Sequence, residues 1–294
     1  MPNIPKVTLN NGLKIPLEGF GVYQISDLDQ CKQSVLEALS AGYRLIDTAQ
    51  FYQNESAVGK AIAQSSVSRK DIFLTTKIGP SQYAYQDNSY ENTKRSVFQS
   101  LKKLQTDYLD LVLLHLPYGD IYGAYRALED LYHKGILKSI GISNFYTDKY
   151  IDFINTVSVT PVVNQVETHV FHQRKTLRKY LKKYHTQIEA WGPFAEGKNH
   201  LFTNPTLTQI GKKYHKSAAQ VALKFLAQNQ IVFIPKSVHK NRIEQNIDIW
   251  DFQLSDTDMV SISKLDLGKS LVLGNLDHEN PKVVEGFRNL IKKA

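Results

Sequence analysis

Short apolar runs alternate with longer amphipathic segments through most of the chain, and this alternation constrains the fold more than any other feature. The short runs suit strands, whereas the longer segments repeat their apolar residues with the 3.6-residue period of a helix. Eight short runs occur: GFGVYQI, RLIDTA, DIFLTTK, YLDLVLLH, KSIGIS, VVNQVE, QIEAW and IVFIP. The pattern predicts eight strands, with helices at 28–41, from Glu55, at 92–104, at 124–132, from Thr147, through Leu177 and from Lys240.

The predicted strands are apolar along their whole length, as in LDLVLL at 109–114. Parallel strands that are buried on both faces have this composition, whereas half-exposed antiparallel strands alternate. Eight βα units in one run favour a closed (β/α)8 TIM barrel. The alternative is an open doubly wound sheet, which would more often carry Gly-x-Gly-x-x-Gly after its first strand. Here that turn reads Gly19-Phe20-Gly21-Val22-Tyr23-Gln24, without the last glycine.

Turn and cap signals mark the limits of these elements. Asn10-Asn11-Gly12 lies between two short apolar segments and predicts an N-terminal β-hairpin, because Asn-Gly favours the positive φ of tight turns. No linker, low-complexity segment or sequence repeat interrupts the pattern, so residues 1–294 are predicted to form a single barrel domain. The expected caps are Gly42 and Gly135 after helices, Ser26 before one, and Ser217 with Gln220 in a capping box.

Composition excludes several classes of protein. The chain is 42% hydrophobic and 22% charged, as in ordinary globular proteins. It has no signal-peptide pattern and no apolar run near the ~18 residues of a membrane span, so we expect a cytoplasmic protein with no membrane partner. The formal charge of +8 falls largely in helical runs such as 174–183, which indicate solvated faces and no nucleic-acid partner. Cys31 is the single cysteine, which excludes an internal disulfide, and no metal site is expected.

Polar side chains stand at the ends of the predicted strands, where a barrel of this type carries its active site. Each has an ordinary explanation when taken alone: a hydrogen-bonded acid, a packing aromatic, a snorkelling lysine, a satisfied histidine. An acid, a phenol, a lysine and a histidine at consecutive positions of one rim together indicate a catalytic site. In strand order the residues are Asp47 and then Tyr52, Lys77, His115, Ser143 with Asn144, and Asn164, Gln165 and Glu167.

These residue types suit the protonation of a carbonyl oxygen. Tyrosine titrates near pH ~10, and a neighbouring ammonium such as that of Lys77 is expected to lower this value. Asp47 would keep Lys77 charged, and a neutral His115 between Leu114 and Leu116 could orient a carbonyl toward Tyr52. No side chain supplies a hydride, so a nicotinamide cofactor is implied.

The chain resembles the aldo-keto reductase family over nearly its whole length. Five segments in the family's order and spacing carry the resemblance: GYRLIDTAQFYQNE with Val58-Gly59-Lys60, LDLVLLHLP, GISNF, NQVE, and IPKSVHKNRIEQN at 234–246. The resemblance implies a monomer that reduces a small-molecule carbonyl compound with NADPH. It also implies a catalytic tetrad of Asp47, Tyr52, Lys77 and His115, with Tyr52 as the proton donor.

The resemblance implies the cofactor and substrate contacts as well. Ser143, Asn144 and Gln165 would hold the nicotinamide carboxamide, and Trp191 would stack on the ring, although it could also be a core aromatic. Two cations and a hydroxyl, from Lys236, Arg242 and Ser237, match positions that bind the 2′-phosphate of NADP, which favours NADPH over NADH. Further cofactor contacts fall on Gly21, Val22, Tyr23, Asp47, Gly192, Phe194, Val238, Gln245 and Asn246, and substrate contacts on Tyr23, Tyr52 and His115.

The chain departs from the family pattern at several positions, so its substrate stays open. Gln245 stands where the family often has glutamate, Leu116 where a bulkier or polar residue is common, and Gly192 where serine is common. The short tail after Leu265 resembles those of bacterial reductases of diketo-sugar acids, glyoxals and simple aldehydes. Two other functions remain: a regulatory subunit that binds NADPH with little turnover, and a lyase that uses Lys77 as a Schiff-base nucleophile.

Overall fold

A computed structural model describes residues 3–79, 89–272, 280, 282, 283 and 285. Eight parallel strands in this part of the chain lie side by side in their sequence order. An open doubly wound sheet would reverse its strand order at a switch point, so that alternative is wrong. The strands are β3 (Phe20–Gly21), β4 (Leu45–Asp47), β5 (Phe73–Ile78), β6 (Leu111–Leu114), β7 (Ile140–Ser143), β8 (Val163–Glu167), β9 (Gln187–Trp191) and β10 (Val232–Phe233).

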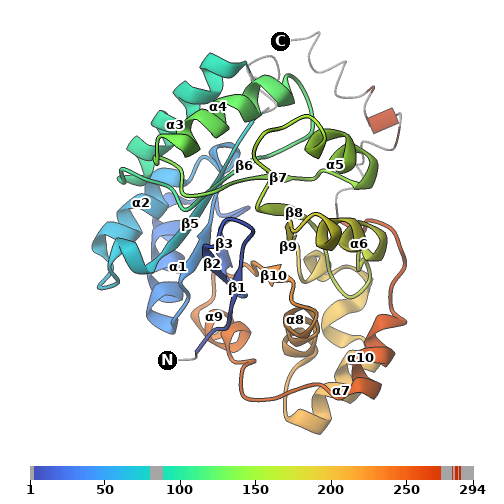
Figure 1. Ribbon diagram of the computed structural model, residues 1–294. Helices are drawn as coiled ribbons and strands as arrows, with labels where there is room; N and C mark the ends of the chain where they lie inside the picture. The colour runs from blue at the N-terminus through green and yellow to red at the C-terminus, as the bar shows by residue number, and fades with distance from the viewer. Residues whose placement is uncertain (1–2, 80–88, 273–279, 281, 284, 286–294) are drawn as a thin grey trace.

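Main-chain hydrogen bonds join the two edges of this sheet. The Phe233 nitrogen donates to the Leu17 oxygen at 2.9 Å, and the Gly19 nitrogen donates to the Phe233 oxygen at 2.9 Å. A parallel bridge pairs Glu18 with Phe233 between them. The sheet is thereby closed, with the helices packed around it (Figure 1), and the predicted TIM barrel is confirmed.

The helices begin where side chains can cap their free N–H groups. Asp27, and not the expected Ser26, caps α1 by accepting from the Gln30 nitrogen at 2.7 Å. Ser89 and Asp120 start α3 and α4 earlier than predicted. The Ser217–Gln220 capping box is confirmed. The helices are α1 (Leu28–Ala41), α2 (Glu55–Gln64), α3 (Tyr90–Leu104), α4 (Ile121–His133), α5 (Thr147–Ile154), α6 (Lys175–Lys183), α7 (Pro205–Tyr214), α8 (Ala218–Gln228), α9 (Lys240–Ile247) and α10 (Asp256–Ser263), with 3-10 turns η1 (Gln50–Tyr52), η2 (Arg69–Asp71) and η3 (Ala195–Thr203).

Both faces of the strands are buried, which explains their continuous apolar sequences. Side chains such as Ile46 and Val112 pack outward against the helices. Their neighbours along the strands, such as Leu45 and Leu111, form a separate cluster with residues of the hairpin and other strands. Because side chains alternate between the faces of a strand, one set of residues faces the barrel interior in every strand.

The predicted N-terminal hairpin is present, and it covers the amino-terminal end of the barrel. Strands β1 (Lys6–Thr8) and β2 (Lys14–Pro16) pair antiparallel. At the turn, Asn10 donates to the Pro161 oxygen at 3.2 Å and Asn11 to the Lys138 oxygen at 3.1 Å, just ahead of β8 and β7. The buried Ile15 packs with the interior cluster from this side. The hairpin therefore leaves the carboxyl ends of the strands for a site.

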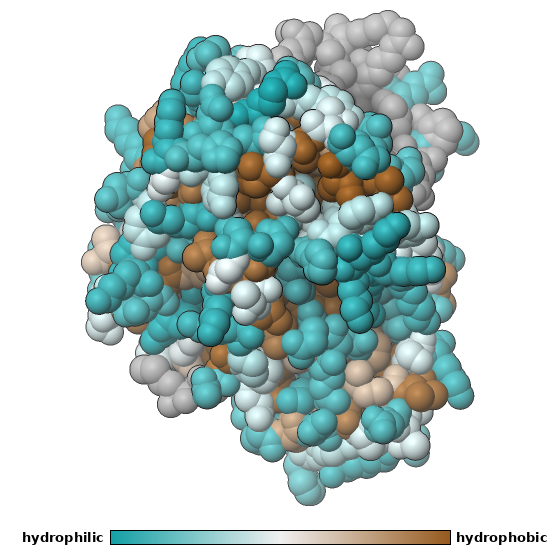
Figure 2. All heavy atoms as spheres, viewed as in Figure 1, coloured by the Kyte–Doolittle hydropathy of each residue, from teal (hydrophilic) through white to brown (hydrophobic). Residues whose placement is uncertain are grey.

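The surface is mainly hydrophilic on the face that Figure 2 shows, with apolar patches between hydrophilic residues. Cys31 is buried in α1. In the described ranges, no helix is both long and apolar enough to span a bilayer.

Candidate active site

The predicted polar cluster lies at the carboxyl end of the barrel. Asp47 is the last residue of β4, Lys77 lies near the end of β5, and His115 directly follows β6. The register pairs Asp47 with Thr75, so Lys77, two residues further along β5, faces the same interior. Tyr52 ends the η1 turn that follows β4. Four residues from three βα units thus meet at one rim.

Lys77 is the centre of this cluster. Its ammonium donates to Asp47 Oδ1, to the Thr48 backbone oxygen at 3.1 Å and to the Tyr52 hydroxyl at 3.2 Å. An ammonium has three N–H donors, and all three have acceptors here. The side chains of Lys77 and Asp47 are almost completely buried. Lys77 is therefore fixed in place between the carboxylate and the phenol.

The charges of this pair support each other. Burial alone lowers the pKa of the Lys77 ammonium, but the negative charge of Asp47 and the contributions of Tyr52 and Glu189 outweigh it, and the pKa is raised. Burial raises the pKa of the Asp47 carboxyl, against the opposing effects of Lys77 and a hydrogen bond from Gln165. An amine nucleophile must be neutral, so this environment disfavours Schiff-base chemistry at Lys77.

The expected lowering of the Tyr52 pKa is not found. Burial raises the pKa of this hydroxyl to about 12, and the charge of Asp47 adds to the rise. Lys77 does lower the pKa, as predicted, but its effect is smaller than the cost of removing a phenolate from water. Tyr52 is therefore fully protonated at neutral pH, as a proton donor must be before it reacts.

His115 is neutral, as predicted. Burial, together with the positive charge of Lys77, lowers its pKa to about 3. Its ring packs edge-on against Tyr52, with 5.8 Å between the ring centroids. A neutral imidazole carries one N–H donor, which can bind an oxygen atom beside the phenol.

A hydrogen-bond network extends the cluster to β7, β8 and β9. Asn144, in the left-handed region at φ 64°, accepts from Trp191 Nε1 at 2.9 Å through its side-chain oxygen. Its amide nitrogen donates to the His115 backbone oxygen at 3.0 Å and to Ser143 Oγ at 3.1 Å. Ser143 Oγ donates to the Gln165 backbone oxygen at 2.9 Å. The structure thus brings these predicted residues together beside the tetrad.

Gln165 leads to an acid that the sequence reasoning did not single out. Its Nε2 donates to Asp47 Oδ2 at 2.9 Å and to Glu189 Oε1 at 3.1 Å. Glu189 lies in the middle of β9 and is completely buried. Burial, reinforced by the charge of Asp47, raises its pKa to about 8, which favours the protonated form. The sequence signal was an acidic residue between two apolar ones in a strand, Ile188-Glu189-Ala190.

Aromatic side chains surround the mouth of the cluster. The ring of Tyr23 packs on Tyr52 with 4.9 Å between centroids, and Phe51 lies 6.2 Å from the His115 ring. Tyr23 and Phe51 are both exposed, at 38% and 36%. Val22, just before Tyr23, is tied to the rim by a hydrogen bond from its nitrogen to the Asp47 oxygen at 3.2 Å.

The predicted phosphate-binding residues lie apart from the tetrad: Lys236 and Ser237 are in the loop after β10, and Arg242 is in the first turn of α9. The Gly21 nitrogen donates to the Pro235 oxygen at 3.1 Å, which ties this loop to β3. Ser237 is buried, Lys236 is half-buried and Arg242 is exposed. No ion pair of either cation occurs within the described residues. The other predicted contacts here, Val238, Gln245 and Asn246, follow along the loop and α9.

Gly192 and Phe194 lie in the loop between β9 and η3. Gly192 has φ 60°, a conformation that L side chains rarely adopt and that suits the glycine found here. Phe194 packs on Phe202, with 5.6 Å between ring centroids. This loop contacts the loop after β3 through a hydrogen bond from Gln24 to Glu196 at 3.2 Å.

Glu167 has a structural role that the sequence did not reveal. It accepts from the Ser270 hydroxyl, from the Leu271 nitrogen at 2.8 Å and from the Val272 nitrogen at 3.1 Å. His169 Nε2 lies 2.9 Å from Glu167 Oε1, the oxygen that also accepts from the two backbone nitrogens. Although burial opposes it, these hydrogen bonds lower the Glu167 pKa to about 2. A charged acid therefore anchors the segment 270–272 beside the rim.

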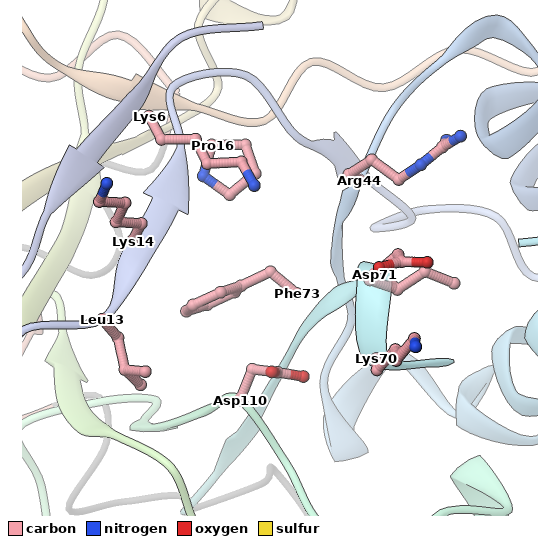
Figure 3. Close-up of a pocket in the computed structure, with 10 residues that line it drawn as sticks. Lys6, Leu13, Lys14, Pro16, Arg44, Lys70, Asp71, Phe73 and Asp110 are labelled. Carbon is pink, nitrogen blue, oxygen red and sulfur yellow. The ribbon is translucent and has the colours of Figure 1, made fainter. Parts of the chain in front are cut away.

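A hollow of about 320 Å³ lies at the opposite end of the barrel (Figure 3). Lys6 and Lys14 of the hairpin, Phe73 at the start of β5 and Asp110 just before β6 line part of it. These residues stand at the amino-terminal ends of the strands, far along β5 and β6 from Lys77 and His115. The hollow is therefore distinct from the polar cluster.

Comparison with known proteins identifies the family. The model of the Aldo/keto reductase family matches residues 19–267, which include the whole barrel. The chain belongs to the aldo/keto reductase family. The resemblance stated from sequence is confirmed, and the chain is an NADP-dependent oxidoreductase that acts on carbonyl groups, which is a different class of enzyme from the lyase considered above.

Several aldo/keto reductases are similar over nearly their full length. Glyoxal reductase of Bacillus subtilis (strain 168) is 42% identical over 260 residues, 88% of this chain and 92% of that protein. Methylglyoxal reductase of Escherichia coli (strain K12) is 36% identical over 274 residues, 92% of this chain and 97% of that protein. Among solved structures, an aldo/keto reductase from Brucella melitensis is 44% identical with a TM-score of 0.84, covering 90% of this chain and all of that one. A Bombyx mori aldo-keto reductase in complex with NADP is 30% identical with a TM-score of 0.84, covering 92% of this chain and 96% of that one.

Proposed function

We propose that this aldo/keto reductase uses NADPH to reduce small, reactive carbonyl compounds of the 2-oxoaldehyde type to alcohols, with Tyr52 as the proton donor. The observation that carries the proposal is the Asp47–Lys77–Tyr52 hydrogen-bonded chain beside a neutral His115 at the barrel rim. The names of the glyoxal and methylglyoxal reductases support the substrate class. The exposed aromatic mouth formed by Tyr23 and Phe51 suits a small, uncharged substrate.

The proton comes from this chain's own residues. His115 donates its N–H to the carbonyl oxygen and orients it toward the Tyr52 hydroxyl. NADPH, when bound, supplies the hydride that adds to the carbonyl carbon. As the oxygen gains negative charge, it takes the Tyr52 proton, and the Lys77 ammonium stabilises the phenolate that remains. A proton from solvent then restores Tyr52. Asp47 keeps Lys77 charged throughout this cycle.

The residues around the cluster fit a nicotinamide cofactor. Among the described residues, no hydrogen bond reaches the side-chain oxygen of Gln165, which leaves one acceptor for the carboxamide. Trp191 is half-buried and is fixed by Asn144, so it can stack on the ring. Lys236, Ser237 and Arg242 would bind the 2′-phosphate, with Gln245 and Asn246 at the adenine.

Purified protein is expected to oxidise NADPH when methylglyoxal or glyoxal is added, and to do so slowly or not at all in their absence. The loss of NADPH absorbance across a panel of 2-oxoaldehydes, simple aldehydes and sugar-derived ketones measures the preference. Reduction of sugar-derived ketones with no activity on 2-oxoaldehydes would contradict the proposed substrate class.

Replacing Lys236 with alanine should weaken NADPH binding by about 10- to 100-fold, the usual value of a charge-assisted hydrogen bond, and leave NADH binding nearly unchanged. Dissociation constants for both nucleotides measure the effect. Lys212→Ala is the matched control, since it removes one positive charge from the exposed side of α7. Equal losses for NADPH and NADH would show that Lys236 does not contact the 2′-phosphate.

A further inference from the structure

We infer that Glu189 is a positioning residue: with Asp47 it occupies both amide hydrogens of Gln165, so that only the amide oxygen of Gln165 faces a bound nicotinamide carboxamide. The inference rests on the proposed function, because it requires a nicotinamide cofactor at this rim. It adds a residue from β9 that determines which end of the carboxamide the site selects.

Both N–H donors of the Gln165 side-chain amide are occupied by carboxyl groups. A side-chain amide has two N–H donors, and Nε2 of Gln165 has two carboxyl acceptors, Asp47 Oδ2 at 2.9 Å and Glu189 Oε1 at 3.1 Å. A rotation of the amide by half a turn would place its oxygen against the Asp47 carboxylate, two acceptors facing each other. The oxygen therefore points away from both acids and can bind only a donor, such as the carboxamide NH2.

The strand register holds Glu189 at this position. Gln165 of β8 and Glu189 of β9 are direct partners in the parallel ladder, so their side chains lie together on the interior face. On the other side, Glu189 is paired with the apolar Val232 of β10. Gln165 and Glu189 are both almost fully buried, which leaves little room for other rotamers.

The packing of the barrel gives no reason for an acid at this position. Oε2 of Glu189 is buried, and no hydrogen bond reaches it in the described part of the chain. A buried polar atom without a partner is unfavourable, and an apolar side chain of similar volume would avoid that cost. The remaining oxygen, Oε1, accepts from Gln165 Nε2. Within the described residues, the one side-chain hydrogen bond of Glu189 is thus the one that orients the amide.

The charges that face Glu189 are consistent with this role. Asp47 and Lys77 face it inside the barrel, Tyr52 lies beyond Lys77, and its neighbours on β8 and β10, Gln165 and Val232, carry no charge. Burial and the charge of Asp47 raise the pKa of Glu189, which favours its protonated form, and the three N–H donors of Lys77 go to Asp47, Thr48 and Tyr52, so Glu189 does not compete with Asp47 for this ammonium.

The test compares NADP+ with its 3-acetylpyridine analogue, which keeps the carbonyl group but replaces the carboxamide NH2 by a methyl group. Dissociation constants from calorimetry or from quenching of tryptophan fluorescence give the ratio of the two affinities.

The wild type should prefer NADP+ by roughly 3- to 10-fold, the value of one neutral hydrogen bond. Glu189→Leu and Glu189→Val should bring the ratio close to one, because Gln165 then has a free N–H for the acetyl oxygen. Glu189→Gln should keep the preference, because its amide oxygen still accepts from Gln165.

Two controls separate orientation from general damage. All variants should bind 2′-phospho-ADP-ribose, which has no nicotinamide, with the affinity of the wild type. Glu18→Leu removes another fully buried acid, bonded by Tyr43 and Trp250 near the start of β3, and should leave the ratio unchanged.

The outcomes are distinct. A full preference for NADP+ in Glu189→Leu and Glu189→Val would overturn the inference, as would an equal change in Glu18→Leu. Failure of both apolar variants to fold would assign Glu189 to the stability of the barrel and would also overturn it. If the wild type bound none of the three nucleotides, the proposed function itself would be wrong.

Discussion

Replacing Tyr52 with phenylalanine is expected to lower kcat/KM for methylglyoxal by about 10²- to 10⁴-fold, the usual contribution of a positioned general acid. The substitution removes only the hydroxyl, whose contact is the Lys77 ammonium at 3.2 Å. Lys77 keeps its other acceptors, Asp47 and the Thr48 oxygen, so the fold should be preserved. Steady-state rates of NADPH consumption measure the loss.

The binding of NADPH to Tyr52→Phe should be close to that of the wild type, which separates a lost proton donor from a damaged site. Tyr122→Phe is the matched control, because this hydroxyl bonds Asp152 on the helices outside the barrel, at 2.6 Å. Turnover by Tyr52→Phe at the wild-type rate would show that Tyr52 is not the proton donor and that another group at the rim has this role.

Replacing Lys77 with methionine should destabilise the protein by about 3–5 kcal/mol, because it leaves the buried Asp47 carboxylate without its cation. It should also remove most activity, since Lys77 lowers the Tyr52 pKa and stabilises the phenolate. Urea unfolding and NADPH consumption measure the two effects.

The loss of stability in Lys77→Met should grow as the pH rises. Burial raises the pKa of Asp47, and removing Lys77 raises it further, because Lys77 opposes the effect of burial. An acid whose pKa is higher in the folded state binds its proton more tightly there, so its contribution to stability falls as pH rises from the unfolded pKa of about 4 toward the folded value. Unfolding at pH 5 and pH 8 gives the comparison.

The double variant Asp47→Asn/Lys77→Met should recover much of the stability, because no unpaired charge remains, but it should not recover activity. A double variant less stable than Lys77→Met would show that the carboxylate of Asp47 is not the source of the destabilisation.

Sequence patterns predicted the barrel because burial on both faces of a strand leaves a continuous apolar run, as at 109–114. The hairpin was predicted for a similar local reason, the turn preference of Asn11-Gly12. The starts of α3 and α4 were missed because Ser89 and Asp120 are polar residues that occur equally in loops, and only the backbone geometry shows that they are caps.

The candidate site was predicted in part. Asp47, Lys77 and His115 stand at strand ends, which the sequence reveals. The Tyr52 pKa was not predictable, because it depends on how far the folded chain removes the hydroxyl from water. The contact of Glu189 with Gln165 depends on the strand register, which the sequence does not give. The role of Glu167 depends on a contact with Ser270, 103 residues away, which only the folded chain shows.

The hairpin covers the amino-terminal end of the barrel and packs on its interior cluster, so ligands reach the polar cluster from the carboxyl ends of the strands. In the proposed function, the nicotinamide at Ser143 and Gln165, each 1% exposed, lies deeper than a carbonyl compound at Tyr23, which is 38% exposed. When two ligands share one entrance, the ligand that lies deeper has to bind first and dissociate last. Under the proposed function, the alcohol would therefore leave while the oxidised nucleotide is still bound, and release of the nucleotide would complete the cycle.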